Sequence, residues 1–289
     1  MKHLILAFFL LQYTLSVDVE LALFNVTVLD EDGHAVSGLN ADNFRVFESD
    51  REQPIKVFQP EDSPSTIGLV IDNSGSMTNK RRDVIVAATA FVSGTNAKDE
   101  VFIVNFNRRA WLALPPLMPF TSNVPQLRAA LLTVTADGTT ALYDALQTAL
   151  SHLEKGTNQR KALVLLSDGA DNASFSTLED IKRLAQKSSA TIYSIGIYDP
   201  DQKDRNPAVL RDLAGQTGGR AYFPRRPADL REIWYRIAGS IRGQYTIGFV
   251  PGAKSRDGAF HKVRISAIDR NNKVLEVRTR PGYYAPASQ

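Results

Sequence analysis

The chain contains no cysteine among its 289 residues. That absence excludes a disulfide framework, thiolate-coordinated zinc and cysteine-based catalysis. The formal net charge is only +3, and the basic residues occur as dispersed pairs such as Arg108-Arg109, which are best explained as solvated surface arginines. Because nucleic-acid binding needs a clustered basic surface, the sequence argues against that class of partner.

Common catalytic motifs are missing as well. The 4 histidines lie far apart and none belongs to an H-E-x-x-H pattern, so a catalytic zinc site is not expected. There is no G-x-S-x-G sequence, which would mark an activated serine, and no G-x-x-x-x-G-K-[ST] phosphate-binding loop. We therefore expect a protein that is not an enzyme.

The amino-terminal segment 1–16, MKHLILAFFLLQYTLS, combines a basic start with a short apolar run and small residues near its end. This pattern is typical of a secretory signal peptide. The run is too short to span a bilayer as a helix, and no other segment is long and apolar enough to do so. The sequence therefore predicts an exported protein without stable membrane insertion.

Hydrophobic patterning divides the rest of the chain into three parts. Residues 17–62 and 242–289 alternate apolar and polar side chains between turn sequences, which indicates β strands. Residues 66–241 alternate short apolar strands with amphipathic helices, which predicts an α/β domain with a doubly wound, mostly parallel sheet flanked by helices. Neither terminal segment has enough strands for a stable sheet, so we expect both to pair in one β-sandwich-like module that contains the α/β domain as an insertion.

Oxygen-bearing side chains gather in three places in the predicted α/β domain. In an open α/β sheet, ligands bind at the carboxyl ends of the strands, and two of these clusters directly follow apolar strands. The clusters are Asp72-x-Ser74-x-Ser76, Thr139-Thr140 and Asp168.

Carboxylates and hydroxyls are the hard oxygen ligands that magnesium prefers. Two carboxylates would nearly neutralise a divalent cation and leave it open to a further carboxylate from a partner. The alternative interpretations are polar turns at Asp72 and Asp168, and a helix cap at Thr139 or Asp137 before the helix expected at 140–154.

In order, spacing and strand context, these residues resemble the metal-ion-dependent adhesion site of von Willebrand factor type A domains. The resemblance covers the α/β part of the chain and implies one bound divalent cation, magnesium first, with manganese or calcium as alternatives. In DGTTALYDAL the family's threonine ligand is expected at Thr139, with Thr140 as the alternative. The implied ligand set is Asp72, Ser74, Ser76, Thr139 and Asp168.

The flanking sequences carry a narrower resemblance. FNVTVLDEDGHAVSGLNADNFRVFESDREQPIKVF and the closing RPGYYAP are similar to bacterial exported von Willebrand A-related proteins of the acidobacterial type. The family resemblance implies a protein-binding module that captures an Asp or Glu carboxylate of a partner protein at the cation. Two alternatives stay open: a structural domain whose metal only stabilises the loops, and a magnesium-dependent phosphoesterase.

Overall fold

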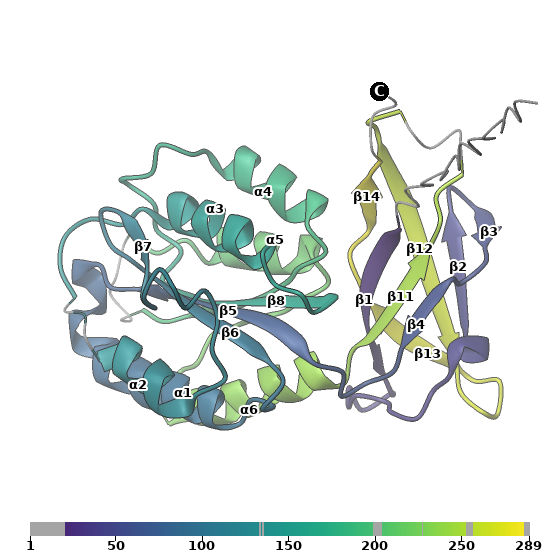
Figure 1. Cartoon of the computed structure of the whole chain (residues 1–289), viewed down its shortest axis with the longest axis horizontal. Coiled ribbons are helices and arrows are strands. Elements are labelled where there is room, and N and C mark those ends of the chain that lie inside the picture. The colour runs from purple at the N-terminus through teal and green to yellow at the C-terminus, as the bar shows by residue number, and fades with distance from the viewer. Residues whose placement is uncertain are drawn as a thin grey trace, which may run out of the picture.

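The computed structural model describes residues 21–132, 134, 136–198, 204–226, 228–252 and 257–285. The predicted signal peptide, residues 1–16, lies outside the described residues. Figure 1 shows two bodies side by side, an α/β domain and a module made mainly of strands, which we call the β module.

A six-stranded sheet forms the centre of the α/β domain, in the order β10-β9-β8-β5-β6-β7. All neighbouring strands are parallel except the edge strand β7, which runs antiparallel to β6. The strands are β5 (Ser65–Asp72), β6 (Glu100–Phe106), β7 (Ala110–Leu112), β8 (Arg160–Ser167), β9 (Thr191–Gly196) and β10 (Ala221–Tyr222).

Helices cover both faces of this sheet, with α3, α4 and α5 on one side and α1, α2 and α6 on the other (Figure 1). The predicted doubly wound α/β fold is therefore confirmed. The helices are α1 (Arg81–Ser93), α2 (Val124–Leu132), α3 (Leu142–Leu153), α4 (Leu178–Lys187), α5 (Pro207–Gln216) and α6 (Asp229–Arg242), with the 3-10 helix η2 (Gly75–Lys80) before α1.

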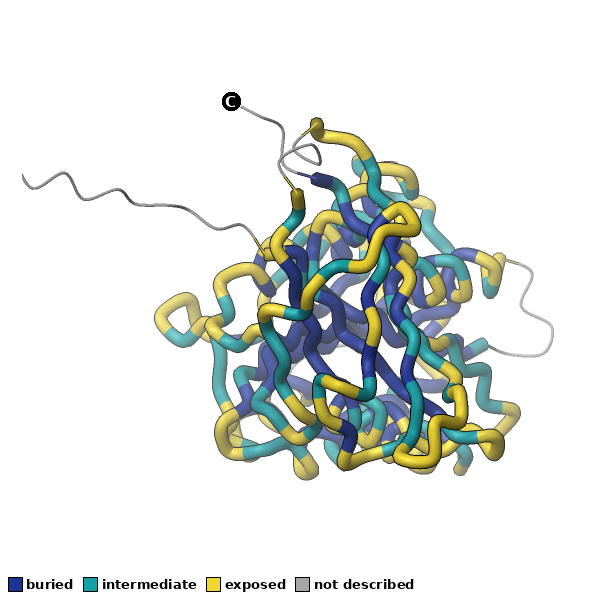
Figure 2. The backbone as a smooth tube through the Cα atoms, turned by 90° about the vertical axis from the view of Figure 1, so that its right-hand side faces the viewer, coloured by how far each residue is buried: buried dark blue, intermediate teal, exposed yellow. Residues whose placement is uncertain are grey.

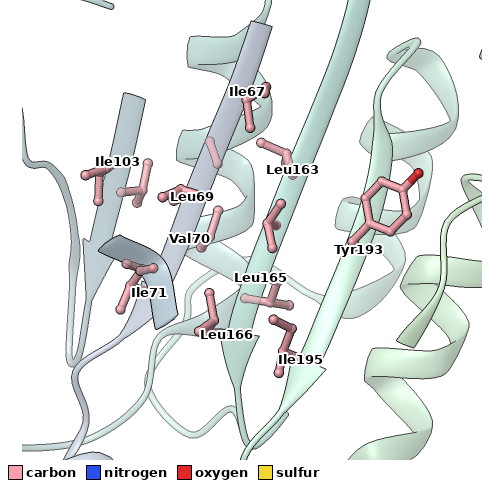
Figure 3. Packing of buried hydrophobic residues seen from close by; sticks show 14 of the residues in the cluster. Ile67, Leu69, Val70, Ile71, Ile103, Leu163, Leu165, Leu166, Tyr193 and Ile195 are labelled. Atoms are coloured by element: carbon pink, nitrogen blue, oxygen red, sulfur yellow. The ribbon is translucent and has the colours of Figure 1, made fainter. Parts of the chain in front are cut away.

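The two central strands have continuous apolar runs, residues 67–71 in β5 and 162–166 in β8, because both faces of the sheet are covered. Every residue of β5 and of β8 is buried. Figure 3 shows Leu69 and Val70 of β5 packed beside Leu163 and Leu165 of β8. Each fully buried side chain of this kind contributes about 1.5–3 kcal/mol, so the core fixes the positions at which these strands end.

Strands from both ends of the chain form the β module. Its strand order is β3-β2-β12-β13-β1-β11-β4, and β14 pairs with β12. Figure 2, which views the molecule from the β-module side, shows buried backbone behind exposed turns. The strands are β1 (Ala22–Leu29), β2 (Phe44–Glu48), β3 (Arg51–Gln53), β4 (Val57–Gln59), β11 (Tyr245–Phe249), β12 (Phe260–Ile268), β13 (Val274–Arg278) and β14 (Gly282–Tyr284), with the 3-10 helix η1 (Ala41–Asn43) before β2.

The pairing of β1 joins the two ends of the chain. Its residues 22–26 pair antiparallel with β11, and its residues 27–29 pair antiparallel with β13. The amino-terminal β2 pairs in the same way with the carboxyl-terminal β12. This arrangement supports our proposal that 17–62 and 242–289 are one module that contains residues 66–241 as an insertion.

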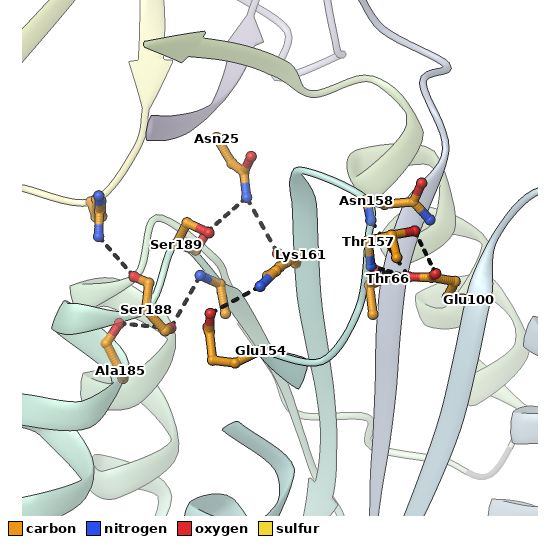
Figure 4. A network of polar contacts seen from close by, with 12 residues as sticks. Asn25, Thr66, Glu100, Glu154, Thr157, Asn158, Lys161, Ala185, Ser188 and Ser189 are labelled. Carbon is orange, nitrogen blue, oxygen red and sulfur yellow. Dashed lines mark hydrogen bonds and ion pairs between the residues drawn. The ribbon is translucent and has the colours of Figure 1, made fainter. Parts of the chain in front are cut away.

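Polar contacts hold the β module against the α/β domain. Asn25 of β1 donates its side-chain amide to the carbonyls of Ser189 (2.9 Å) and Lys161 (3.3 Å), as Figure 4 shows. Arg280, near the carboxyl end, donates to the carbonyls of Ser188 (2.7 Å) and Leu23 (2.8 Å). These buried contacts lie at the end of the α/β sheet where β5 and β8 begin, so the carboxyl ends of the strands point away from the β module (Figure 1).

Candidate metal centre

The loop that follows β5 brings three of the predicted ligands together. Asp72 is the last residue of β5, and it and Ser74 are buried, whereas Ser76 is exposed. The Ser74 backbone N–H donates to Asp72 Oδ1 at 2.8 Å, which turns the chain sharply after the strand. The Ser74 and Ser76 hydroxyl oxygens then lie 3.2 Å apart.

Asp168 reaches the same place from the neighbouring strand. It directly follows β8, which pairs in parallel with β5, and it is fully buried. The Ser76 hydroxyl donates to Asp168 Oδ2 at 2.7 Å, and the Ala170 backbone N–H donates to Asp168 Oδ1 at 3.0 Å. The structure therefore brings Asp72, Ser74, Ser76 and Asp168 together at one edge of the sheet.

The candidate centre places two buried carboxyl groups, Asp72 and Asp168, close enough for their negative charges to repel each other. The pKa of Asp72 is raised to about 6, mainly because the carboxyl group is buried; hydrogen bonds from Ser74 and Ser167 oppose the increase, and the nearby charge of Asp168 adds a smaller one. A buried carboxylate is costly to ionise unless a positive charge or strong donors compensate for the lost water. No ion pair neutralises Asp72 within the described part of the chain.

Residues 136–141, which we call the threonine loop, precede α3 and form backbone hydrogen bonds with the Asp72–Ser76 turn. The Asp137 N–H donates to the Asn73 carbonyl at 2.9 Å, and the Gly75 N–H donates to the Gly138 carbonyl at 3.0 Å. Thr139 is exposed, whereas Thr140 is 4% exposed. The loop therefore reaches the Asp72–Ser76 turn through its backbone, with Thr140, the alternative ligand, buried and Thr139 open to solvent.

Neither residue proposed as a helix cap has that role. Helix α3 begins at Leu142, its N-cap is Ala141, and no side chain caps it. The alternative explanation of Thr139 or Asp137 as the cap of this helix is therefore wrong. The helix begins two residues later than expected, at Leu142 in place of residue 140. The backbone before it is bonded to another loop, since the Ala141 N–H donates to the Asn107 carbonyl at 2.6 Å.

Sequence reasoning missed Ser167, which lies directly beneath the candidate centre. Its hydroxyl donates to Asp72 Oδ2 at 2.7 Å and accepts from the Gly169 N–H at 3.1 Å. The available signal was a serine directly after the apolar run Ala162–Leu166 and directly before Asp168. Its position identifies it as a residue that orients Asp72.

A second missed group, made by Asn73, Asn105 and Arg81, supports the turn from below. Asn73 is fully buried, and its amide donates to the Ile71 carbonyl (2.9 Å) and to Asn105 Oδ1 (3.1 Å). Arg81 of α1 donates to Asn73 Oδ1 and, at 3.1 Å, to the Leu131 carbonyl of α2. The turn that carries Ser74 and Ser76 is thereby fixed to β6, α1 and α2.

Glycine has a different role at the two turns. Gly75 does not have a positive φ, and a Cβ there would lie 3.4 Å from the Gly138 carbonyl oxygen, an ordinary contact. Gly169, by contrast, has φ +81°, and a Cβ there would lie 2.3 Å from the Asn206 carbonyl oxygen. The special backbone conformation therefore follows Asp168 and not Ser74.

The donor set fits a hard divalent cation. Carboxylate and hydroxyl oxygens from Asp72, Ser74, Ser76 and Asp168 are the ligand type that magnesium, manganese and calcium take, and none of the four residues offers nitrogen or sulfur. The two serine hydroxyls contact each other and a carboxylate, and no histidine among the described residues forms a hydrogen bond with them to act as a base.

Comparison with protein families places this geometry in a known context. Residues 67–170 match the family model described as von Willebrand factor type A domain. The chain contains a von Willebrand factor type A domain. All of the residues discussed as ligands, Asp72, Ser74, Ser76, Thr139, Thr140 and Asp168, fall inside the matched range.

Solved structures share the fold of this chain at low sequence identity. A von Willebrand factor type A protein from Catenulispora acidiphila has 17% identity and a TM-score of 0.56, covering 93% of this chain and 74% of that one. The proximal thread matrix protein 1 of the mussel byssus, with a zinc-occupied adhesion-site motif, has 18% identity and a TM-score of 0.54, covering 67% of this chain and 49% of that one. The type V pili tip protein Mfa5 of Porphyromonas gingivalis has 16% identity and a TM-score of 0.51, covering 62% of this chain and 95% of that one. No curated protein matched.

One other group of potential metal ligands lies outside the von Willebrand A domain. Asp30, Asp32 and His34 follow β1 in the β module, and their potential ligand atoms lie within 4.8 Å of one another. Asp30 Oδ1 accepts from the backbone N–H groups of Asp32 (3.0 Å) and His34 (2.8 Å), so local turn hydrogen bonds explain this grouping. It serves below as a control for the candidate centre.

Proposed function

We propose that the von Willebrand A domain of this chain is a non-enzymatic protein-binding module. Asp72, Ser74, Ser76 and Asp168, with a threonine of the loop 139–140, would hold one divalent cation. When bound, that cation would supply a positive centre with a coordination position available to an Asp or Glu carboxylate of a partner protein. Magnesium is the expected cation, and manganese or calcium are alternatives.

The observation that carries this proposal is the convergence of four oxygen-bearing side chains from two parallel strands. Their hydroxyl and carboxylate oxygens lie 2.7–3.2 Å apart between Ser74, Ser76 and Asp168. Asp72 is oriented by the Ser74 N–H and the Ser167 hydroxyl, so the chain positions its carboxylate before any ligand arrives. Such preorganisation lowers the entropic cost of binding.

We also propose that the protein acts outside the cytoplasm, as the amino-terminal sequence predicts. Mfa5, which shares the fold, is described as a pili tip protein, and another neighbour, from Bacteroides fragilis with a TM-score of 0.50, as an aerotolerance-related membrane protein. Among the described residues of this chain, no helix combines the length and apolar character needed to cross a membrane. A nucleic-acid partner is not proposed.

Carboxylate binding is tested directly with two fluorescent peptides that differ only in one Asp replaced by Asn. We expect the Asp peptide to bind in magnesium and not in EDTA, and Ser74→Ala to abolish that binding. Ser93→Ala on the exposed end of α1 is the control, because Ser93 only bonds its own helix through the Thr89 carbonyl. Equal binding of both peptides, or Asp-peptide binding that survives EDTA and Ser74→Ala, would contradict the proposal.

The structural alternative makes a different prediction. If the cation only stabilised the loops, EDTA would lower the melting temperature, and neither peptide would bind in magnesium. Measuring both quantities on the same samples separates the two functions.

A further inference from the structure

Two exposed features that the proposed function leaves unused flank the candidate metal centre. One is the turn Asn107–Arg109 between β6 and β7, and the other is Phe175 in the loop between β8 and α4. The threonine loop lies between them and contacts both. The Ala141 N–H donates to the Asn107 carbonyl at 2.6 Å, and the Thr140 carbonyl accepts from the N–H groups of Asn172 (2.9 Å) and Ala173 (3.1 Å).

The arginine turn presents two positive charges without local compensation. Arg108 and Arg109 are both exposed, and the turn is closed by the Asn107 N–H, which donates to the Arg109 carbonyl at 3.1 Å. Neither arginine forms an ion pair with a carboxylate of residues 21–132, 136–198 or the later described segments. Other exposed arginines are of both kinds: Arg45, Arg226 and Arg236 form ion pairs with nearby carboxylates, whereas Arg82, Arg128 and Arg270 have no ion pair among the described residues.

Phe175 is an aromatic side chain held out in water by an anchored backbone. It is 99% exposed. Its N–H donates to Asp144 Oδ2 at 3.0 Å, and the next N–H, of Ser176, donates to Asp144 Oδ1 at 2.9 Å. Burial alone would raise the pKa of Asp144, but these hydrogen bonds outweigh it and lower the pKa, so the carboxylate is ionised and accepts both bonds at neutral pH.

The same loop is fixed at two further points. Asn172 Oδ1 accepts from the Thr140 N–H at 2.8 Å, and Asp171 Oδ1 accepts from the Ser174 hydroxyl at 2.5 Å. A single exposed apolar residue is ordinary on a protein surface. Here, however, the backbone that carries the ring is anchored to Asp144 and belongs to the loop that begins at Asp168, and aromatic side chains are enriched at protein–protein interfaces.

We propose that this face binds an acidic protein segment that presents several neighbouring carboxylates beside an apolar surface. One carboxylate occupies the metal position, Arg108 and Arg109 attract the others, and Phe175 packs against the apolar part. This inference rests on the proposed function, and it narrows the partner from any Asp or Glu to an acidic cluster with an apolar neighbour. The commitment to an acidic partner comes from charge complementarity: two unpaired arginines lie beside a site for a cation.

The probes are three fluorescein-labelled peptides of equal length, measured by fluorescence polarisation in magnesium. The first contains three successive Asp residues and a Leu-Leu pair, the second has Ser-Ser in place of Leu-Leu, and the third has Asn in place of every Asp. We expect the first to bind more tightly than the second, and the third not to bind.

The variants are paired with controls from elsewhere in the chain. Arg108→Gln/Arg109→Gln should weaken binding of the first peptide by roughly tenfold at low salt, with a smaller loss at high salt, because exposed charge contacts are screened. Arg45→Gln/Arg270→Gln removes the same charge from the exposed surface of the β module and should have no such effect. Asp137→Asn, which removes an exposed carboxylate from the threonine loop, should strengthen binding.

Phe175→Ser should weaken binding of the Leu-containing peptide by about fivefold and leave the Ser-containing peptide unchanged. Leu117→Ser is its control, because Leu117 is 100% exposed on the loop that follows β7. That loop leads to the opposite end of the sheet, where Thr121 pairs with Val101 at the start of β6.

Three other results of these binding measurements would contradict the inference, and one of them would also contradict the proposed function. Magnesium-dependent binding of Asp peptides that ignores the Arg108/Arg109 and Phe175 variants overturns this inference and leaves the proposed function intact. Absence of magnesium-dependent binding for every peptide overturns both. Tighter, magnesium-independent binding of a fluorescein-labelled oligonucleotide would assign the arginines to a different partner and also overturn the inference.

Discussion

The Ser167 hydroxyl connects the ends of the two central strands by donating to Asp72 Oδ2 at 2.7 Å. The Ser167 hydroxyl oxygen also accepts from the Gly169 N–H at 3.1 Å. One side chain therefore positions both the Asp72 carboxylate at the end of β5 and the turn that carries Asp168 after β8. Replacing residues that orient metal ligands in this way typically lowers metal affinity about 10–100-fold.

Ser167→Ala is therefore expected to weaken manganese binding by about 10–100-fold while the domain stays folded. The loss follows because Asp72 would lose the Ser167 hydroxyl and be oriented by its hydrogen bonds from Ser74. Manganese affinity is measured by titration calorimetry. Ser194→Ala is the matched control: Ser194 is fully buried on the neighbouring strand β9, and its hydroxyl has no hydrogen-bond partner among the described residues. Equal affinities for wild type and Ser167→Ala would show that Ser167 is merely a core residue.

The threonine ligand is assigned by a pair of isosteric substitutions. Thr140 is buried beside the candidate centre and Thr139 is exposed, so we expect Thr140→Val to reduce manganese affinity and Thr139→Val to have little effect. Valine preserves the shape of threonine and removes only the hydroxyl. The same calorimetric titration measures both variants. The reverse order of effects would restore Thr139 as the ligand.

The α/β fold could be predicted from the sequence because strands that are buried on both faces appear as continuous apolar runs. Runs such as Ile67–Ile71 and Ala162–Leu166 contain no polar side chain, and they form the middle of the two central parallel strands. The rule that ligands gather at carboxyl strand ends then placed Asp72 and Asp168 together, which the structure shows.

The remaining features depend on contacts that are remote in sequence. Which of two adjacent threonines faces the centre depends on the path of the loop, and that path is set by Asn107 and Asn172. Arg160 and Arg280 are buried although arginine is usually exposed, because carbonyl groups from distant segments surround them. No local pattern reports such long-range hydrogen bonds.

Arg160 is expected to be essential for stability, because it joins both connections between the domain and the β module. It is fully buried and donates to carbonyls on both connecting segments, including Pro60 (2.9 Å) and Gln244 (2.5 Å). Burial lowers its pKa to about 10, so it stays charged at neutral pH.

Arg160→Met should lower the free energy of unfolding by about 3–5 kcal/mol, because several buried carbonyls lose their donor. Urea denaturation measures the change. Arg128→Met on the exposed face of α2 is the control and should change stability by less than about 0.5 kcal/mol. A similar, small effect of both substitutions would contradict this role.

Glu100 gives a prediction for pH. Burial alone would raise its pKa, but hydrogen bonds from Thr66, from Thr157 and from the Asn158 N–H, several of them drawn in Figure 4, outweigh it and lower the pKa below the usual 4.5. The folded state therefore favours ionised Glu100, and its contribution to stability is fully present above pH 4.5 and is lost as the pH falls through the lowered pKa.

Glu100→Gln should accordingly reduce the free energy of unfolding by about 1–2 kcal/mol at pH 7, and the difference from wild type should shrink as the pH falls below the usual pKa. Urea denaturation at a series of pH values measures it, with Glu179→Gln on the exposed side of α4 as the control. A difference that stays constant down to the acid transition would contradict the assignment.

The central claim is that one divalent cation binds at the ends of β5 and β8. Titration calorimetry with manganese on three proteins tests it most directly: wild type, Ser76→Ala/Asp168→Asn, and Asp32→Asn/His34→Gln, which alters the acidic group of the β module. The account predicts one binding site in wild type, none in Ser76→Ala/Asp168→Asn, and one unchanged site in Asp32→Asn/His34→Gln. Binding that survives Ser76→Ala/Asp168→Asn, or that is lost only in Asp32→Asn/His34→Gln, would contradict it.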